Sequence, residues 1–592
     1  MPKPTPDFSA LPFPEDAPFT AEQQAWISGY LAGMKAQLKA QDASQDTNNA
    51  AGPGPLLNVL YGSQTGNAES VAEDAAAMAM NQGMEVTLKE LDAVSVDELQ
   101  AMTACLVVVS TYGEGEMPDN AKLFWESVSS TQAPRLEQLT YAVLGLGDTS
   151  YDQFCQSAKL IDTRLEQLGA RRAAQRIDCD VDFEDPATAW LEASLPEFSD
   201  QPAAAKEALN KSTPVLTEQR SAWTRKRPFS AQMIANDRLS GAGSAKDIRH
   251  IAISLGDSDV EYTAGDALGI VPKNHADLVA VVIQRLGGRM DSAVMGYDAP
   301  LGELLTQRFE IMTPSRDLLE YLHTHAGDDE LSHVVGNGDK EALDAYLWGK
   351  DVLDLLNLKP SLRVAIDEFV ALLRPLQHRA YSIASSELAF PGEVHLTVAA
   401  VRWHAHERAH RGVASTWLAD ALSIGREAEV FPLPNKNFRL PKAADVPVIM
   451  VGPGTGIAPF RAFLQARQQL RGGGKNWLFF GDQHRSSDFI YSDELAALAT
   501  DGTLTRLDLA FSRDQRDKLY VQHRMRENSR ELYAWLEDGA SVYVCGDATR
   551  MARDVDQALH DVVQLEGALT ESAASDYINR LKREKRYLRD VY

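Results

Sequence analysis

The sequence predicts a multidomain protein in which two parallel α/β modules flank a region of antiparallel strands that carries a helical insertion. Its 592 residues suggest roughly three to five domains. Strand and helix patterns alternate near both ends of the chain, whereas short alternating apolar segments fill the middle. A hydrophobic fraction of 44% is enough for several cores and excludes a wholly disordered chain.

Composition and charge exclude several classes of function. The formal net charge of −26 disfavours nucleic acid and anionic bilayers as partners. We expect no membrane span, because no stretch approaches ~18 consecutive uncharged apolar residues, and no secretory signal, because no basic region precedes an apolar run. The four cysteines form no CxxC pair, so we expect no disulfides, no zinc or iron–sulfur site, and a cytoplasmic location.

The charge is unevenly distributed along the chain. Residues 61–200 hold 25 acidic and 8 basic side chains, a net charge of −17, whereas the rest of the chain carries −9. One interpretation is a surface that keeps the protein in solution, and the other is a domain that docks on a basic partner. Charge alone does not decide between them.

The N-terminal region, residues 1–55, is predicted to be a short helix followed by a linker. Residues 20–39 have an amphipathic pattern whose apolar side includes Trp26, Tyr30 and Met34. Residues 40–55 have the Gln, Asn, Gly and Pro content of a linker. The helix is too short and too polar to span a membrane.

The first α/β module spans residues 56–198. The apolar runs LLNVLYG, CLVVVS and YAVLGLGD alternate with helical periodicity, which is typical of a parallel sheet with helices on both faces. Residues 199–225 are polar, contain Ala and Pro, and show no periodicity, so we predict a flexible linker there.

The first strand of this module runs into a loop suited to a phosphate. Exposed backbone N–H groups and a helix dipole at such a strand-to-helix loop favour an anion. No lysine ends the loop, which disfavours a nucleoside triphosphate and favours a singly phosphorylated ligand. The alternative is an ordinary capped turn. The loop residues are Ser63, Gln64, Thr65, Gly66, Asn67 and Ala68.

Two further loops follow later strands of the same module, at the sheet edge where ligands of open α/β folds bind. Each brings one aromatic side chain, Tyr112 or Tyr151, able to stack on a flat ring. A phosphate loop with two aromatic loops predicts an FMN site. The first loop contains Ser110, Thr111, Tyr112 and Gly113, and the second contains Leu146, Gly147, Asp148, Thr149, Ser150 and Tyr151.

The middle region, residues 226–442, is predicted to be an antiparallel barrel, interrupted by a mostly helical insertion at about 273–375. A strand beginning with RAYS offers an arginine for a pyrophosphate and a tyrosine that packs on a flavin. The string GVAS opens a helix, a second phosphate-binding arrangement, so the two together predict FAD. Their residues are Arg379, Ala380, Tyr381, Ser382, Gly412, Val413, Ala414 and Ser415.

The last module, residues 443–592, returns to the parallel α/β pattern. A strand at 446–451 runs into the glycines of GPGTG and then a helix from Ile457, which resembles a dinucleotide turn without being GxGxxG. After a later strand, Ser512, Arg513 and Lys518 offer a hydroxyl and two cations for the 2′-phosphate of NADPH rather than NADH. The alternative is a solvated run of charges.

Two residues near the C-terminus are further candidates. Cys545 ends the strand SVYVCGD, where a thiol can face the nicotinamide, although a lone cysteine there is otherwise a small apolar residue. Tyr592 is the last residue. A terminal aromatic either covers the flavin face that the nicotinamide must reach or is only a chain end.

These motifs resemble the diflavin reductase family, and within it the branch that serves sulfite reductases. The resemblance runs from about residue 20 to Tyr592. The AWISGY segment and the RDVY ending favour this branch over the microsomal reductases, which carry an N-terminal membrane anchor that we do not find here. The strings that carry the resemblance are AWISGY, SQTGNA, STYGEG, LGDTSYDQFCQS, LLRPLQHRAYSIASS, VIMVGPGTGIAPFRAF, GKNWLFFGD, AFSRDQRDKLYVQ, YVCGDATRMARDV and RYLRDVY.

The resemblance implies a flavodoxin-like FMN domain, an FAD-binding barrel and a ferredoxin-reductase-like NADP-binding domain. It implies a relay from NADPH through FAD and FMN to a haemoprotein subunit with sirohaem and an iron–sulfur cluster, which reduces sulfite to sulfide. In this family the N-terminal region is linked to oligomer formation. One alternative is a reductase for a haem monooxygenase or another acceptor. A second is a non-catalytic flavodoxin-like carrier, against which the NADPH module argues.

Carried over residue by residue, the resemblance also implies the cofactor contacts. FMN contacts include the three loops above and Asp152, Gln153, Phe154 and Cys155. FAD contacts include the RAYS and GVAS residues with Thr397, Val398, Ala399, Trp403 at the adenine, Tyr592 and, more weakly, Ser315. NADPH contacts are Ser512, Arg513, Lys518, Leu519, Tyr520, Val521, Gln522 and Asp554. Ser382, Cys545 and Asp590 resemble the trio that assists hydride transfer in the family.

Overall fold

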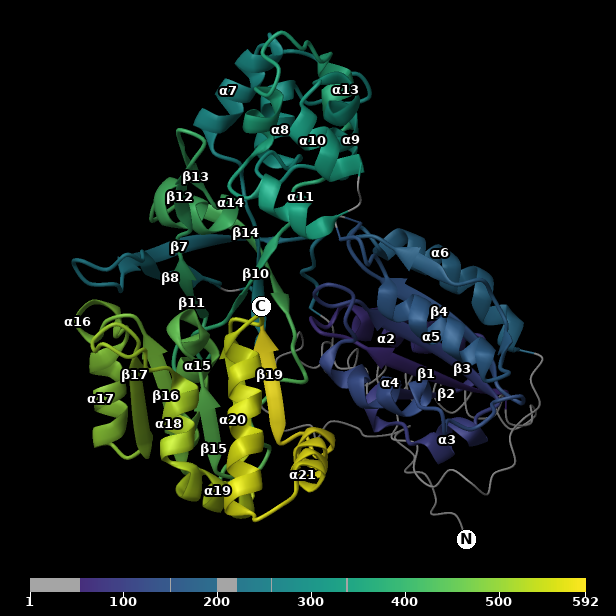
Figure 1. The fold of residues 1–592 in the computed structure, drawn as a ribbon, viewed down its shortest axis with the longest axis vertical. Helices are drawn as coiled ribbons and strands as arrows, with labels where there is room; N and C mark the ends of the chain where they lie inside the picture. Colours follow the sequence, from purple (N-terminus) through teal and green to yellow (C-terminus); the bar gives the residue numbers. More distant parts are fainter. Residues whose placement is uncertain (1–53, 150, 200–220, 257, 337–338) are drawn as a thin grey trace, which may run out of the picture.

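The computed structural model of the protein describes residues 54–149, 151–199, 221–256, 258–336 and 339–592. The predicted N-terminal helix and most of the predicted linker lie outside the described residues. Figure 1 shows the first α/β module, in purple and blue, beside a body formed by the barrel, the teal helices and the last α/β module, with the C-terminus between them. No helix of the described segments is long and apolar enough to cross a bilayer.

The first module is a parallel sheet, as predicted. Its strands lie in the order β2-β1-β3-β4-β5, and β6 also pairs with β4. Its main elements are β1 (Leu56–Gly62), α2 (Asn67–Asn81), β2 (Glu85–Glu90), α3 (Val96–Ala101), β3 (Ala104–Ser110), α4 (Lys122–Ser129), β4 (Thr140–Leu146), α5 (Gln156–Gln167), β5 (Arg171–Arg172), β6 (Ile177–Cys179) and α6 (Glu184–Ser194).

Packing explains why the central strands of this module are apolar throughout. β1, β3 and β4 are buried along nearly their whole length, because helices cover both faces of the sheet. Alternate residues of these strands contribute to two apolar clusters, one on each face. The inner side of α2 is lined by alanines such as Ala72, Ala75 and Ala79, none of which is exposed, so the helix approaches the sheet closely.

The middle region forms a six-stranded antiparallel sheet in the order β10-β9-β14-β7-β8-β11. A bridge between Ile383 and Leu396 joins the two edge strands and closes the sheet, which confirms the predicted barrel. Its elements are β7 (Phe229–Arg238), β8 (Ile248–Ser254), β9 (Ala267–Val271), β10 (Arg379–Ser382), β11 (Glu393–Ala399) and β14 (Glu427–Leu433). A hairpin of β12 (Arg402–Ala405) and β13 (Arg408–Arg411) leads into α14 (Val413–Thr416).

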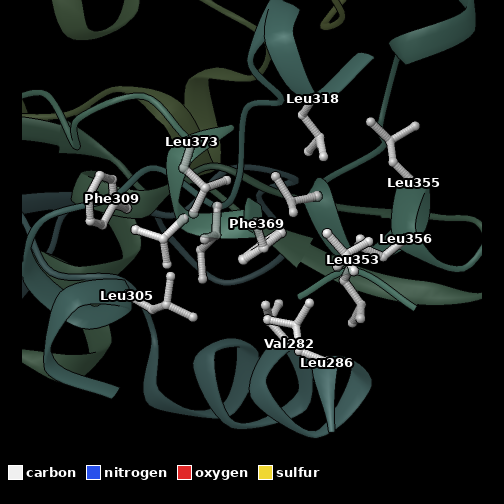
Figure 2. Packing of buried hydrophobic residues seen from close by; sticks show 14 of the residues in the cluster. Val282, Leu286, Leu305, Phe309, Leu318, Leu353, Leu355, Leu356, Phe369 and Leu373 are labelled. Atoms are coloured by element: carbon white, nitrogen blue, oxygen red, sulfur yellow. The ribbon is translucent and has the colours of Figure 1, made fainter. Parts of the chain in front are cut away.

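The predicted helical insertion lies between β9 and β10 and has an apolar core of its own. Figure 2 shows Val282 and Leu286 pointing towards the same interior as Leu353, Leu356 and Phe369. Its helices are α7 (Ala276–Leu286), α8 (Leu301–Gln307), α9 (Arg316–His325), α10 (Asp329–Gly336), α11 (Lys340–Leu347), α12 (Val352–Leu356) and α13 (Ile366–Ala371).

The last module is a second parallel sheet, with strands in the order β17-β16-β15-β18-β19. The strand expected at 446–451 begins two residues later, and a 3-10 turn over Gly454–Ile457 precedes the helix. The elements are β15 (Val448–Val451), α15 (Ala458–Leu470), β16 (Asn476–Asp482), α16 (Arg485–Asp488), α17 (Ser492–Thr500), β17 (Arg506–Phe511), α18 (Val521–Glu527), α19 (Ser529–Glu537), β18 (Ser541–Gly546), α20 (Met551–Glu566), α21 (Glu571–Arg583) and β19 (Tyr587–Val591).

The acidic first module docks on basic side chains of the rest of the chain. This contact favours the second of the two interpretations of the uneven charge, with the basic partner in the same polypeptide. The close pairs are Glu73–Lys436 at 2.6 Å, Asp182–Arg225 at 2.8 Å, Glu184–Arg225 at 2.6 Å, Asp185–Lys226 at 2.6 Å, and Glu90–Lys585, Glu114–Lys340 and Asp119–Arg589. Three looser pairs are Glu116–Arg553, Asp148–Arg374 and Asp152–Arg316, at 3.9 to 4.0 Å.

Candidate functional site

The predicted phosphate loop, residues 63–68, lies between β1 and α2. Gly66 has a φ of +88°, a left-handed conformation that favours glycine, and it caps the N-terminus of α2. The Ser63 hydroxyl accepts the Ala68 N–H at 3.2 Å, and the Ser63 N–H donates to the Asn120 side chain at 2.8 Å. The amide oxygen of Asn120 is the acceptor in this bond, and its amide nitrogen, Nδ2, is buried without a partner among the described residues. A free donor beside a helix N-terminus fits a phosphate.

The two predicted aromatic loops lie next to each other at the same sheet edge. The Thr111 N–H donates to the Leu146 carbonyl at 2.9 Å, and the Thr111 hydroxyl accepts the Ser157 N–H at 3.2 Å. Tyr112 is half-buried and Tyr151 is exposed, while Ser150 lies outside the described residues. The structure therefore brings the three loops expected around FMN to one edge of one sheet.

One residue that holds the second loop, Asp180, was missed in the sequence. Its carboxylate accepts the Thr149 N–H at 3.0 Å and the Thr149 hydroxyl at 2.6 Å. Asp180 follows β6 directly, so it lies at the same carboxyl edge as the predicted loops. A position directly after a strand could have identified Asp180 in the sequence. However, β6 is only three residues long and gives no clear strand pattern.

The RAYS segment forms β10 and places Arg379 at its start. The Arg379 guanidinium donates through Nη1 to the Gln377 carbonyl at 2.8 Å and through Nη2 to Glu310 at 3.2 Å. Its Nε–H has no partner among the described residues and suits a phosphate oxygen. Burial raises the pKa of Tyr381 to about 12, so its hydroxyl stays protonated.

The GVAS residues open the short helix α14, and Val413, Ala414 and Ser415 are buried in its first turn. The Ser415 hydroxyl accepts the Val401 N–H at 3.2 Å, which ties this turn to the strand segment that leads into the β12–β13 hairpin. On that hairpin, Trp403 stacks on His410 with ring centres 5.5 Å apart. The remaining predicted FAD contacts of this region lie on β11, the edge strand that the bridge between Ile383 and Leu396 joins to β10. They are Thr397, Val398 and Ala399.

Ser315 has a structural role in this arrangement. It is the N-cap of α9, where its hydroxyl accepts the Leu318 N–H at 3.1 Å and donates to the Leu372 carbonyl. Both hydrogen bonds lie within the helical insertion, and capping explains a serine at this position without a cofactor. The FAD contact implied for Ser315 stays a prediction that no geometry favours.

The glycine turn of the last module is closely packed against β18. A side chain at Gly456 would place its Cβ 2.2 Å from the Cys545 carbonyl oxygen, so only glycine fits. Lys246, from the barrel, reaches the same turn and pairs with the buried Asp482 at 2.5 Å. Sequence reasoning missed this cation, because Lys246 precedes the turn by about 200 residues and no local pattern marks it.

The loop expected for the 2′-phosphate follows β17. Its backbone is held at Ser512 by the Asp482 carbonyl, at 2.8 Å, whereas the side chains of Arg513 and Lys518 are exposed. Tyr520 stacks on His523 with ring centres 5.9 Å apart. The Gln522 amide donates to Asp554 at 2.9 Å, so two of the predicted NADPH contacts meet. Leu519 and Val521 lie between these residues at the start of α18.

The structure brings together the predicted trio Ser382, Cys545 and Asp590. The Ser382 hydroxyl donates to Asp590 Oδ2 at 2.7 Å, and Cys545 Sγ lies 3.8 Å from the same oxygen. Burial raises the pKa of the Asp590 carboxyl, although the hydrogen bonds from Ser382 and Cys545 oppose this shift. Burial, and then the Asp590 charge, raise the pKa of the Cys545 thiol well above its usual value, so it stays a thiol.

Strand β19 links this trio to the FMN loops. Tyr592, whose side chain is 61% exposed, places its hydroxyl 3.1 Å from that of Thr455 in the glycine turn. Next to it, the Val591 carbonyl accepts the Tyr112 hydroxyl of the first module at 3.1 Å. Arg589 pairs with Asp119, and Figure 1 shows the C-terminus between the two bodies. Burial alone raises the pKa of Asp119, but Arg589 and Lys122 outweigh it and lower that pKa to about 2.

Three known families match successive parts of the chain. Residues 59–190 match the flavodoxin family, residues 221–417 match the FAD binding domain, and residues 450–557 match the oxidoreductase NAD-binding domain. The protein is therefore an oxidoreductase of the class that joins a flavodoxin to a two-domain flavin reductase, with FMN, FAD and a nicotinamide nucleotide as cofactors.

Three curated relatives, among others, match along nearly their whole length. Each is a sulfite reductase [NADPH] flavoprotein alpha-component. The protein of Bacillus subtilis (strain 168) is 42% identical, and those of Cronobacter sakazakii (strain ATCC BAA-894) and Klebsiella pneumoniae subsp. pneumoniae are each 40% identical. Each alignment covers 97% of this chain and 96% of the relative. The chain belongs to the family of sulfite reductase [NADPH] flavoprotein alpha-components.

The comparisons confirm the predicted fold class, the diflavin resemblance and the set of cofactors. Which side chains contact each cofactor stays a prediction, and so do the domain boundaries drawn at residues 55, 198, 225 and 442. The structure brings the FMN loops together, the hydride trio together, and Gln522 to Asp554. It does not join Ser315 to the barrel residues expected around FAD.

Proposed function

We propose that this protein is the NADPH-oxidising flavoprotein of an assimilatory sulfite reductase. Electrons would pass from NADPH to FAD, from FAD to FMN, and from FMN to a haemoprotein subunit with sirohaem and an iron–sulfur cluster, for the six-electron reduction of sulfite to sulfide. The observation that carries the proposal is the contact of Tyr112, in an FMN loop, with Val591, next to the hydride trio.

The two flavins supply the conversion of a two-electron donor into single-electron steps. Within that scheme, the chain's own residues bind, orient and balance charge. Ser382 and Cys545 hold the Asp590 carboxylate by hydrogen bonds at the end of β19, where it can offset positive charge that develops on the nicotinamide. Lys246 and the glycine turn offer a cation and backbone N–H groups to the nucleotide phosphates.

The relatives are alpha-components, which together with the acidic first module supports a haemoprotein as the partner. A haemoprotein that presents basic side chains would meet the same carboxylates that now contact Lys340, Lys436 and Arg589. We also propose a cytoplasmic location, supported by four free cysteines. Oligomer formation through the N-terminal 55 residues stays a prediction. Residues 1–53 of this region lie outside the described residues.

The test is reconstitution with a sirohaem- and iron–sulfur-containing haemoprotein. The full chain, NADPH and sulfite should give sulfide only when both proteins are present. NADPH oxidation with an artificial electron acceptor serves as the control for an intact flavoprotein. Rapid oxidation with the artificial acceptor but no sulfide would favour the alternative, a reductase for a haem monooxygenase or another acceptor. No oxidation with either would argue for a carrier without catalytic function.

A further inference from the structure

A buried carboxylate of the helical insertion lies behind the arginine expected to bind FAD. Glu310 follows α8, and its side chain is only 1% exposed. Its Oε2 accepts a hydrogen bond from Arg379 Nη2 at 3.2 Å. Its Oε1 accepts the N–H groups of Met312 and Thr313 at 2.8 and 3.3 Å. Both oxygens therefore have partners, and none is left to face a ligand.

The backbone around Glu310 is fixed against the strand that leads to Arg379. The Glu310 N–H donates to the Arg374 carbonyl at 2.9 Å, and the Leu376 N–H donates to the Arg308 carbonyl at 2.7 Å. Phe309 and Pro375 form an antiparallel bridge between these bonds. The carboxylate and the arginine are thus held from two segments more than 60 residues apart in sequence, which packing of the insertion brings together.

Arg379 itself is partly open to solvent, with a side chain 38% exposed. Its Nη1 donates to the carbonyls of Gln377 and His378 at 2.8 and 3.3 Å, and its Nη2 donates once to Glu310. Of the five N–H groups of a guanidinium, these bonds leave Nε–H and one Nη2–H without a partner among the described residues. Two such donors are the number that a bidentate contact with a phosphate needs.

We infer that Glu310 is a positioning residue for FAD: it fixes the guanidinium plane of Arg379 from behind and so prepares its outer donors for the pyrophosphate. The inference rests on the proposed FAD site at Arg379. A long arginine side chain that is ordered before binding loses less conformational entropy when the ligand arrives. The helical insertion would thereby contribute to FAD affinity without touching FAD.

The test compares FAD affinity in full-length variants whose FMN site is kept saturated with FMN. Glu310→Ala should weaken FAD by roughly three- to tenfold, the range that corresponds to ordering one rotamer-rich side chain. Glu310→Gln keeps the shape and an acceptor oxygen, so its loss should be smaller, about two- to threefold. Riboflavin, which has no pyrophosphate, should bind each variant as it binds the unaltered protein. In Arg379→Ala, the further change Glu310→Gln should have no effect on FAD affinity.

Asp162→Asn is the matched control. Like Glu310, Asp162 is a buried carboxylate paired with arginine, but it lies in the first module. Its partners are Arg172 and Arg176, both at 2.9 Å. This variant should lower the unfolding temperature and leave FAD affinity unchanged.

Three results would overturn the inference. The first is an equal loss of affinity for FAD and riboflavin, which would indicate a structural role. The second is tighter FAD binding in Glu310→Gln, which would indicate competition for Arg379. The third is additive losses of FAD affinity in the double variant. If Glu310→Ala does not fold, Glu310→Gln decides. Should Arg379→Ala itself retain FAD, the proposed FAD site is wrong rather than the role of Glu310 alone.

Discussion

The two parallel α/β modules place their sites at the same edge of the sheet but equip that edge differently. In the first module, the loop at 63–68 offers backbone N–H groups, hydroxyls and the Asn120 amide, and no cation belongs to it. In the last module, Arg513 and Lys518 are exposed in the loop after β17, and the trio around Asp590 lies at the end of β19. We therefore expect the first edge to hold a ligand and the last to discriminate between ligands and to support chemistry.

The difference extends to how each module meets the rest of the protein. The acidic side chains of the first module contact basic residues of the barrel, the insertion and the last module. Examples of these basic residues are Lys436, Lys340 and Arg589. Such charge pairs at a solvent-accessible boundary are individually weak and reversible. A substitution at the last module's edge should therefore change chemistry or specificity, whereas one at the first module's edge should change docking.

The largest effect is expected at Asp590. Asp590→Asn keeps the size of the side chain but removes the charge that Ser382 and Cys545 hold in place. Flavin reduction by NADPH, followed by stopped-flow absorbance, should slow by roughly 100-fold, the usual cost of removing one preorganised electrostatic group. Tyr112→Phe, which removes the first module's hydrogen bond to Val591, should leave the rate of this step unchanged. Equal slowing in both variants would contradict the division of roles between the two edges.

The next effect concerns the choice of nucleotide. Arg513→Ala should weaken NADPH by about 10- to 100-fold and NADH much less, because a charged hydrogen bond contributes roughly 1.5–3 kcal/mol. The measurement is the ratio of kcat/KM for NADPH and NADH. Arg516→Ala, an exposed arginine in the same loop that was not among the predicted contacts, is the control and should leave this ratio near its original value. An equal loss for both nucleotides in Arg513→Ala would show that this loop does not bind a 2′-phosphate.

The sequence predicted the arrangement of the loops best where a strand runs directly into a loop. The loops at 63–68, 110–113 and 146–155 follow apolar strands, so parallel pairing alone brings them to one edge. Three residues could not be predicted from the sequence, because each lies 31 to 236 residues from its partner and only packing brings the two together. The pairs are Glu310 with Arg379, Lys246 with Asp482, and Asp180 with Thr149. Uneven charge likewise indicated a docking surface but not which lysine or arginine meets which carboxylate.

A tenfold effect is expected for docking of the first module. Asp119→Asn removes one partner of the partly buried pair with Arg589 and should lower the docked fraction by about tenfold, since the partly desolvated Arg589 charge loses its carboxylate while other pairs remain. Small-angle X-ray scattering should show a larger radius of gyration. The control Asp97→Asn makes the same charge change at an exposed position. An unchanged radius of gyration in Asp119→Asn would mean that this pair does not hold the two bodies together.

The docking contact should also respond differently to pH and to salt. Since the pKa of Asp119 is lowered to about 2, its contribution is complete above the ordinary value near 3.8 and is lost only as the pH falls towards 2. We therefore expect the scattering profile to be constant between about pH 5 and 9. Raising the salt concentration should expand the molecule, because the outer ion pairs are screened. Expansion on raising the pH within this range would point to a different titrating group.

The smallest effect is expected at the terminal residue. Tyr592 is held at its backbone by Gly546 and Ala548, at 3.1 Å each, and its hydroxyl lies 3.1 Å from that of Thr455. Thr455 belongs to the glycine turn that is expected to bind the nucleotide. We therefore expect NADPH and Tyr592 to compete for the space beside this turn. A ring packed against the flavin would add about 0.5–1.5 kcal/mol beyond its buried area, which is a two- to tenfold effect on affinity.

Deleting Tyr592 should therefore have two opposed consequences. FAD should dissociate more readily, because the stacking contact is lost, and NADP⁺ should bind more tightly and leave more slowly, because its competitor is gone. Tyr592→Phe is the matched variant: it keeps the ring and removes only the hydrogen bond to Thr455, so FAD retention should stay normal while NADP⁺ binding tightens slightly. Stopped-flow flavin reduction and NADP⁺ affinity measure both consequences. If the deletion leaves hydride transfer, NADP⁺ binding and FAD retention unchanged, the last residue is only a chain end, and the chemistry of this edge is carried by the trio around Asp590 alone.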